Sequence, residues 1–142
     1  MTASDPHGLA TPILLFVYGT LRPSLASAAT HALVHDLERA GAATMRGVLY
    51  DLGPYPAMLR GDGIVHGELL CVHDAVRLRA LDAYEECGGP APRFERVEGI
   101  ARRADGVEVA AAAYLYVGPI GDGVVIAGGD YAPVARARRP TF

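Results

Sequence analysis

The 142-residue sequence contains no tryptophan, no lysine, only two cysteines and few aromatic side chains, 7% in all. Cys71 and Cys87 form neither a CxxC pair nor a zinc-ligand spacing, so we expect buried free thiols rather than a disulfide framework. The 13 basic residues are all arginine, are scattered, and stand against 16 acidic residues, giving a net charge of −3. This balance leaves no basic face for nucleic acid.

Long apolar runs are also lacking. The longest strong run, Ile13–Tyr18, stops at Gly19, well short of the roughly 20 residues that span a bilayer. The first eleven residues carry an acid and no basic segment, unlike a secretion signal. We therefore expect a cytoplasmic protein with neither a membrane nor a nucleic-acid partner. The oligomeric state has no signature in the sequence.

What is present is a composition typical of one globular domain, with 51% hydrophobic and 20% charged residues. Residues 1–11 are predicted to form a flexible tail and residues 12–142 a single domain. Hydrophobic patterning and turn signals predict mostly strands, with a loop-like stretch after residue 117. The expected strands are 13–18, 43–52, 57–60, 65–72, 94–103 and 107–117, and the expected helices are 24–40 and 75–86.

The order of these elements determines the expected fold class. Strands and helices do not alternate strictly, and the Ala104–Gly106 segment is a strong hairpin signal between the last two strands. A turn is also expected at Gly61–Gly63, between the third and fourth strands. The pattern predicts an α+β fold in which a mixed sheet curls into a small barrel with flanking helices.

Glu85 is the most informative residue of the second expected helix. The apolar stripe of this helix runs through Leu78 and Leu81 and continues at helical spacing to Glu85, so its carboxyl group faces the core side. Burial without a partner raises the pKa of a carboxyl group toward neutrality, which makes Glu85 a candidate general base and acid. The stripe ends there, however, and a glutamate in a last helical turn also commonly bends back to solvent.

The exit from the first strand, residues 18–22, is the second candidate site. A glycine at position 19 lets successive backbone N–H groups face outward, where they can hold a carboxylate or a developing oxyanion. Arg22 would add a bidentate clamp on a substrate carboxylate, although a surface arginine in a turn is equally consistent with the sequence.

Signals for metals and cofactors are weak. His31 and His35 have the i, i+4 spacing of a chelating pair, but no third ligand accompanies them, so we expect solvent-facing side chains. The sequence has no GxSxG, no P-loop and no HExxH. It predicts no metal site and no cofactor.

An ordered set of short motifs resembles the gamma-glutamylcyclotransferase-like family, including its AIG2-like members. The similarity covers residues 13 to 117, with a fainter match at Gly129–Tyr131. The order of the motifs carries the resemblance, since each one alone is common. The motifs are FVYGTLR (16–22), GVLYDLG (47–53), YPA (55–57), VHGEL (65–69), LDAYE (81–85), FER (94–96) and AYLY (113–116).

The resemblance implies a small mixed barrel whose enzymes cyclise gamma-glutamyl groups without a metal or cofactor. It places the catalytic glutamate on Glu85, the residue that helical spacing also singles out. A pocket closed by the two tyrosines of AYLY, Tyr114 and Tyr116, is a further expectation. The implied substrate-binding loop consists of Tyr18, Gly19, Thr20 and Leu21, with Arg22 as the candidate clamp.

The expected reaction is attack of the substrate's own α-amine on its γ-carbonyl, which releases 5-oxoproline and a free amine. Glu86 follows the glutamate where many family members have glycine, and Phe94 occupies a position where tyrosine is common. The sequence therefore does not predict the identity of the leaving amine. Two alternatives remain. One is a non-catalytic module that binds a small anion at residues 18–21, with Glu85 as a structural acceptor. The other is an amide hydrolase, which would release free glutamate.

Overall fold

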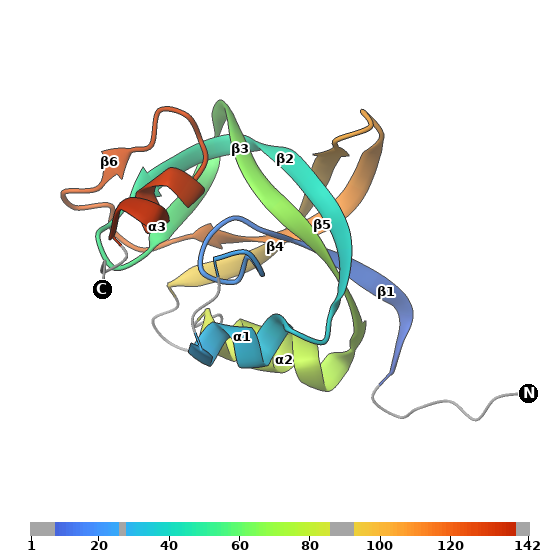
Figure 1. Ribbon diagram of the computed structural model, residues 1–142. Helices are drawn as coiled ribbons and strands as arrows, with labels where there is room; N and C mark the ends of the chain where they lie inside the picture. Colours follow the sequence, from blue (N-terminus) through green and yellow to red (C-terminus); the bar gives the residue numbers. More distant parts are fainter. Residues whose placement is uncertain (1–7, 26–27, 86–92, 139–142) are drawn as a thin grey trace, which may run out of the picture.

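A computed structural model describes residues 8–25, 28–85 and 93–138 (Figure 1). The described chain is mostly strand with short helices, which confirms the predicted α+β class. The elements in chain order are β1 (Gly8–Val17), α1 (Ala28–Val34), β2 (Glu38–Asp51), β3 (Pro56–Asp74), α2 (Ala75–Tyr84), β4 (Phe94–Arg103), β5 (Glu108–Tyr116), β6 (Val124–Val125) and α3 (Ala132–Arg138).

The sheet is mixed and closes on itself. Its order is β3-β1-β5-β4-β2-β6, and an additional pairing of β3 with β2 joins the first strand of that order to the fifth. β1 runs parallel to β5 and antiparallel to β3. The closure is uneven, because β2 pairs with β3 over most of its length but with β4 only at residues 43–45. The sheet is therefore ring-like rather than a regular barrel.

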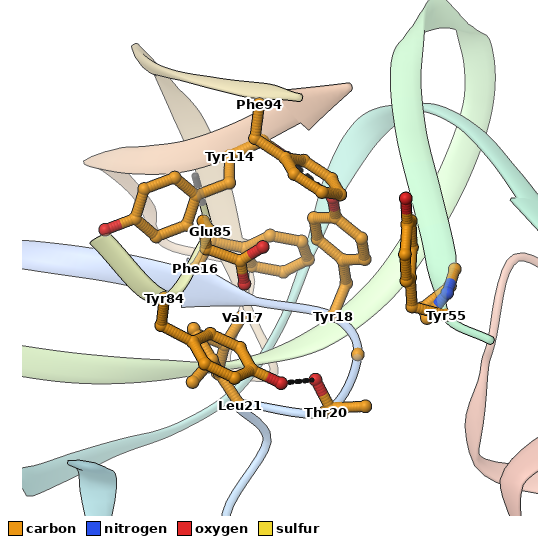
Figure 2. A pocket seen from close by; sticks show the side chains of 12 residues that line it. Phe16, Val17, Tyr18, Thr20, Leu21, Tyr55, Tyr84, Glu85, Phe94 and Tyr114 are labelled. Atoms are coloured by element: carbon orange, nitrogen blue, oxygen red, sulfur yellow. Dashed lines mark hydrogen bonds between the residues drawn. The ribbon is translucent and has the colours of Figure 1, made fainter. Parts of the chain in front are cut away.

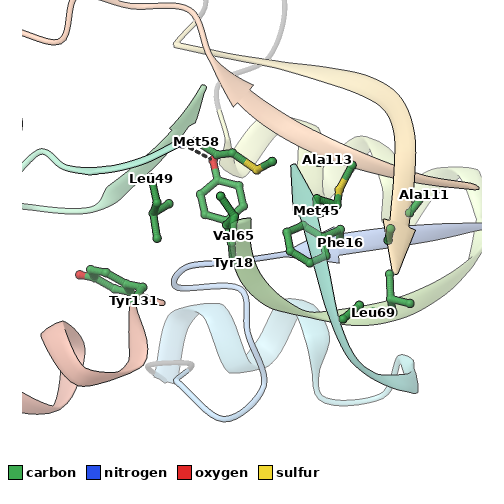
Figure 3. Close-up of a cluster of buried hydrophobic side chains, with 12 residues drawn as sticks. Phe16, Tyr18, Met45, Leu49, Met58, Val65, Leu69, Ala111, Ala113 and Tyr131 are labelled. Carbon is green, nitrogen blue, oxygen red and sulfur yellow. Dashed lines mark hydrogen bonds between the residues drawn. The ribbon is translucent and has the colours of Figure 1, made fainter. Parts of the chain in front are cut away.

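β1 lies between β3 and β5, and its last residues, Leu15–Val17, are buried on both faces, as the unbroken apolar run predicts. Phe16 points into the ring, where it packs in a cluster with Met45, Leu69 and other side chains (Figure 3). Its neighbours Leu15 and Val17 point the other way, into a second cluster beneath the helices. Side chains of a strand alternate between faces, so one strand serves both clusters.

α1 and α2 lie side by side against the outer face of the sheet (Figure 1). α2 begins after Asp74, whose side chain accepts a hydrogen bond from the N–H of Val76 at 2.7 Å, as expected for an N-cap. Leu78 and Leu81 are buried against β1 and β3, as the predicted stripe requires. In the described residues, no helix has the length and apolar character that crossing a bilayer requires.

The predicted turn at 61–63 is wrong, because β3 runs through it as one strand. β2 stays paired on both sides of this point, with Arg46 opposite Ile64 and Val48 opposite Leu59. Between these two pairs the register shifts, so that Gly47 alone lies opposite residues 60–63 of β3, and the strands stay paired on both sides of this irregularity. The hairpin predicted around Gly106 is confirmed, with that glycine at φ 87°.

The first helix is shorter than the predicted 24–40, because strand pairing overrides the helical pattern at its end. Glu38 and Arg39 pair with β3 instead of continuing the helix. β1 also begins before the predicted residue 13, at Gly8, which pairs with Asp74. This strand overlaps residues 8–11 of the predicted tail, and residues 1–7 lie outside the described chain.

The final stretch is not purely loop-like, which corrects the prediction. It contains the short strand β6 and the helix α3, which packs beside β2 and β3 (Figure 1). Asp130 accepts a hydrogen bond from the N–H of Ala132 at 2.9 Å, and Arg138 at the other end of α3 binds Asp51 of β2. Side-chain contacts from distant strands thus fix a segment whose local sequence gives little signal.

Candidate active site

A cavity of about 170 Å³ opens where β1 ends, between its exit loop, the end of α2 and the start of β4 (Figure 2). This size suits an amino-acid-like ligand rather than a macromolecule. Most of the lining is aromatic or apolar. The lining residues are Phe16, Val17, Tyr18, Gly19, Thr20, Leu21, Tyr55, Pro56, Tyr84, Glu85, Phe94 and Tyr114.

Glu85 supplies the carboxylate of this cavity and lies at the C-cap of α2. Its backbone N–H bonds to the carbonyl of Leu81 at 3.1 Å, which fixes the residue at the end of the helix. The side chain is half-buried and points toward the cavity that Phe16 and Tyr84 also line (Figure 2). The structure therefore places Glu85 at the cavity rather than in bulk solvent.

A hydrogen bond joins the strand-exit loop to the end of α2. The hydroxyl groups of Thr20 and Tyr84 are 2.9 Å apart (Figure 2). Burial raises the pKa of the Tyr84 phenol, and the Thr20 bond lowers it while the charge of Glu85 raises it. The phenol therefore stays protonated at neutral pH, and the bond holds the loop close to the residue that precedes Glu85.

The loop itself has a tight conformation. The N–H of Arg22 donates to the carbonyl of Gly19 at 2.9 Å, which closes a turn around residues 19–22. A Cβ added at Gly19 would lie 2.7 Å from Cγ of Pro56, which also lines the cavity. A glycine at this point thus lets β1 turn into the loop beside the cavity wall.

Tyr18 and Tyr114 line the cavity with their rings while their hydroxyl groups bond elsewhere. The hydroxyl of Tyr18 donates to the carbonyl of Tyr114 at 2.6 Å and accepts from the N–H of Met58 at 3.3 Å. The hydroxyl of Tyr114 donates to Asp82 of α2 at 2.7 Å. These bonds tie β1, β3, β5 and α2 together around the cavity.

Arg22 is not among the residues that line the cavity. Its Nε donates to Glu68 and its NH1 to Asp130, each at 2.8 Å. The guanidinium links the exit loop to β3 and to the segment before α3. The carboxyl of Asp130 loses solvent on burial, which opposes ionisation, but the N–H of Ala132 and the charge of Arg22 outweigh this and lower its pKa.

Tyr116 also lies outside the cavity lining, and its hydroxyl donates to the carbonyl of Pro119 at 2.9 Å. Its ring packs edge-on against Phe94, with centroids 5.3 Å apart, and faces Tyr55 at 6.5 Å. The Tyr116 ring therefore packs against two residues that line the cavity, Phe94 and Tyr55. Arg93 bonds to the hydroxyl of Tyr55 at 3.1 Å in the same area.

Sequence analysis missed six lining residues: Phe16, Val17, Tyr55, Pro56, Tyr84 and Phe94. All six lie within the quoted FVYGTLR, YPA, LDAYE and FER motifs, so the family pattern held a signal for them. Helical and strand periodicity held none, because the cavity forms between elements far apart in the chain. Glu86 and Cys87 lie outside the described residues.

The histidine pair and the cysteine discussed from the sequence lie away from this cavity. His31 and His35 are exposed, as predicted, with ring centroids 5.1 Å apart. Cys71 is a free thiol but is half-buried rather than buried, which corrects the prediction. Burial and the negative charge of Glu38 raise the pKa of the Cys71 thiol.

The class of protein is defined by two features. A small mixed sheet forms the fold, and the carboxylate of Glu85 lies beside the exit loop of β1 in one cavity. The chain belongs to the gamma-glutamyl cyclotransferase, AIG2-like family, whose family model matches residues 15–133. The gamma-glutamylcyclotransferase family protein ytfP of Citrobacter rodentium is 36% identical over 75 residues, which are 53% of this chain and 63% of that protein. The aligned part thus spans less than two thirds of this relative.

Solved structures share the fold. YkqA from Bacillus subtilis superimposes with a TM-score of 0.67 at 22% identity, over 92% of this chain but only 44% of that longer chain. ytfP from Escherichia coli gives a TM-score of 0.58 at 29% identity, over 84% of this chain and 96% of that one. A structure named gamma-glutamyl cyclotransferase gives 0.60 at 18% identity, over 75% and 67%. The family resemblance seen in the sequence is confirmed.

Proposed function

We propose that the protein is a gamma-glutamyl cyclotransferase that converts a gamma-glutamyl amide into 5-oxoproline and a free amine. One observation carries the proposal: Glu85 and the exit loop at residues 19–21 line the same cavity. Family membership supports the same class of reaction. The small, largely aromatic cavity fits a substrate of amino-acid size.

The reaction requires one bond to form and one to break at the γ-carbonyl carbon. The substrate's α-amine attacks this carbon, the carbonyl oxygen becomes an oxyanion, and the bond to the departing nitrogen then breaks. Nucleophile and electrophile belong to one short chain, so holding that chain folded supplies much of the rate enhancement. No covalent intermediate with the protein is needed in this scheme.

Glu85 has the proton-transfer role in the proposal. The substrate's α-ammonium group is not a nucleophile until it loses a proton, which the carboxylate accepts. The same carboxyl group then returns this proton to the departing nitrogen, while the attacking nitrogen releases its second proton to solvent as the lactam N–H forms. One positioned acid and base thus serves both steps, a role typically worth 10²- to 10⁴-fold in rate.

The exit loop has the electrostatic role. Backbone N–H groups of residues 19–21 would donate to the oxyanion, and one such donor is worth about 3 to 4 kcal/mol in well-studied enzymes. The guanidinium of Arg22 is already bound to Glu68 and Asp130. In our scheme the backbone N–H groups of the exit loop therefore also bind the substrate's carboxylate. The ring of Tyr84 and the Thr20 hydroxyl border the same space.

The test is Glu85→Gln, assayed for 5-oxoproline release from glutathione, gamma-glutamyl dipeptides and gamma-glutamyl amines. We expect wild-type protein to release the lactam from at least one substrate, and the variant to lose this activity at unchanged melting temperature. Glu95→Gln is the matched control, because Glu95 is an exposed glutamate on β4 that does not line the cavity.

The products separate the alternatives. Free glutamate in place of the lactam would identify an amide hydrolase. Binding of gamma-glutamyl compounds without turnover would identify a non-catalytic module. Activity of Glu85→Gln within a few fold of wild type would remove Glu85 from the mechanism.

A further inference from the structure

Three metal-ligating side chains lie together at the end of the β2–β3 pairing, outside the candidate active site. Glu38 is the first residue of β2, and Cys71 and His73 lie near the end of β3. The carboxylate oxygen, thiol sulfur and imidazole nitrogen that they offer all lie within 4.8 Å of one another. We refer to these three residues as the donor cluster.

The register of the sheet brings the donors to one face. Glu38 is directly opposite Cys71 in the antiparallel pairing, and opposed residues share a face. His73 lies two residues beyond Cys71 along β3 and therefore points the same way. The intervening Val72 is fully buried on the other face, in the cluster beneath the helices. Paired strands, rather than a loop, hold the cluster in place.

The separation of the donors is compatible with a bridging ion. Oε2 of Glu38 and Nε2 of His73 are 3.6 Å apart, beyond ordinary hydrogen-bond length. Around a tetrahedral Zn²⁺, with nitrogen and oxygen ligands at about 2.0–2.2 Å, two such atoms would lie about 3.4 Å apart. The side chains of His73 and Glu38 are 59% and 72% exposed, so small rotations can complete the coordination.

The chemistry of the donor set indicates which ion would bind. A thiolate and an imidazole favour Zn²⁺ over the hard ions Mg²⁺ and Ca²⁺, which prefer oxygen. Three protein ligands with a fourth position left to water are a recurring zinc arrangement. Coordination requires the Cys71 thiol to release its proton to solvent as the sulfur–metal bond forms.

We propose that Glu38, Cys71 and His73 form a binding site for a borderline-soft divalent cation, with Zn²⁺ as the favoured ion and water in the fourth position. The ion joins the first residue of β2 to the end of β3 and so fixes the sheet beside the N-terminus of α2. This site is independent of the proposed cyclotransferase activity, because none of its residues lines the cavity.

The test uses the purified 142-residue chain, freed of metal with a chelator and titrated with Co²⁺, whose bond to a thiolate gives a charge-transfer absorption band. We expect a band that saturates at one ion per chain and that Zn²⁺ abolishes by displacement. Cys71→Ser should abolish the band. His73→Gln and Glu38→Gln should each weaken Co²⁺ binding at least tenfold.

Two variants serve as matched controls. Cys87→Ser removes the other thiol of the sequence, and the double variant His31→Gln/His35→Gln removes the exposed histidine pair of the α1 region; both should keep the band. His73→Gln changes an exposed side chain, so the test does not depend on folding of the cysteine variant. No band in wild type, a band that survives Cys71→Ser, or Co²⁺ affinity within twofold of wild type in His73→Gln would each overturn the proposal.

Discussion

The two ends of the β1–β3 pairing carry the two groups of reactive side chains, and they differ in enclosure. At one end, where Val17 faces Glu68, the chain enters an aromatic cavity with a half-buried carboxylate. At the other end, where Leu14 faces Cys71, three donors lie on an open face. An enclosed site can orient a small substrate and exclude water, whereas an open site suits an ion that keeps a water ligand.

Different kinds of contact position the side chains at the two ends. Backbone pairing of β2 with β3 positions the donor cluster. The cavity depends on side-chain bonds from distant segments: Thr20 to Tyr84, Tyr18 to Tyr114, and Arg22 to both Glu68 and Asp130. We therefore expect single substitutions in these contacts to perturb the cavity end far more than the donor cluster.

The largest expected effect separates the two sites by function. Glu85→Gln should reduce lactam formation by about 10²- to 10⁴-fold, because it removes the proposed proton carrier. It should leave the cobalt titration unchanged. Measuring both properties on the same preparation checks the separation, and a changed Co²⁺ affinity would show that the two ends are coupled.

The next largest effect is expected in the segment before α3, where Asp130 binds Arg22 of the exit loop. Gly129 has φ 66°, and an added Cβ would lie 1.9 Å from the carbonyl oxygen of Ile64, so Gly129→Ala should lower the free energy of unfolding by about 3 kcal/mol. Gly53→Ala is the matched control, because Gly53 has φ 99° with nothing within 4 Å. Urea unfolding should show a clearly smaller loss for the control, about 1 kcal/mol. Equal losses would show that the contact with β3 has no effect.

Arg22→Met should lower the free energy of unfolding by about 2 kcal/mol, because it leaves Glu68 and Asp130 without their cation in a partly buried position. Arg60→Met, at an exposed arginine of β3, is the control. The KM of the folded variant should change less than tenfold. A large rise in KM with unchanged stability would instead support the substrate clamp predicted from the sequence.

A smaller effect is expected for the bond between the exit loop and α2. Thr20→Val and Tyr84→Phe each remove one hydroxyl of the 2.9 Å pair and should cost about 1 kcal/mol of stability. Combining them should cost less than the sum, and thermal unfolding of all four proteins gives the coupling. Strict additivity would mean that the hydrogen bond does not join these elements in solution.

The smallest effect concerns the surface pair of Asp36 and Arg77, which joins the end of α1 to α2. The hydrogen bond from Arg77 lowers the pKa of Asp36 from 3.8 to about 2. Because the folded state has the lower value, the stabilisation is present above pH 4 and is lost as the pH falls toward 2. Asp36→Asn should therefore lower the melting temperature slightly at pH 7, and by a smaller amount as the pH falls from 4 toward 2. Asp122→Asn, at an exposed acid, should show no such pH dependence.

Much of the fold follows from local sequence. The apolar run of β1, the stripe through Leu78 and Leu81 and the hairpin at Gly106 each give a signal within a few residues, and the structure confirms all three. The continuous β3, the short α1 and the helix α3 were missed. Their conformations depend on partners such as β2 and Asp51, which lie far away in the chain.

The sequence by itself determined the family, the strand-rich fold class and the choice of Glu85 as a candidate residue, because periodicity and motif order are properties of a linear chain. The tertiary structure decided which side chains meet. It joined Glu85 to the exit loop, bound Arg22 to two carboxylates and aligned Glu38 with Cys71 and His73. These contacts arise from sheet register and helix docking, which pair residues whose separation along the chain carries no information about their distance in space.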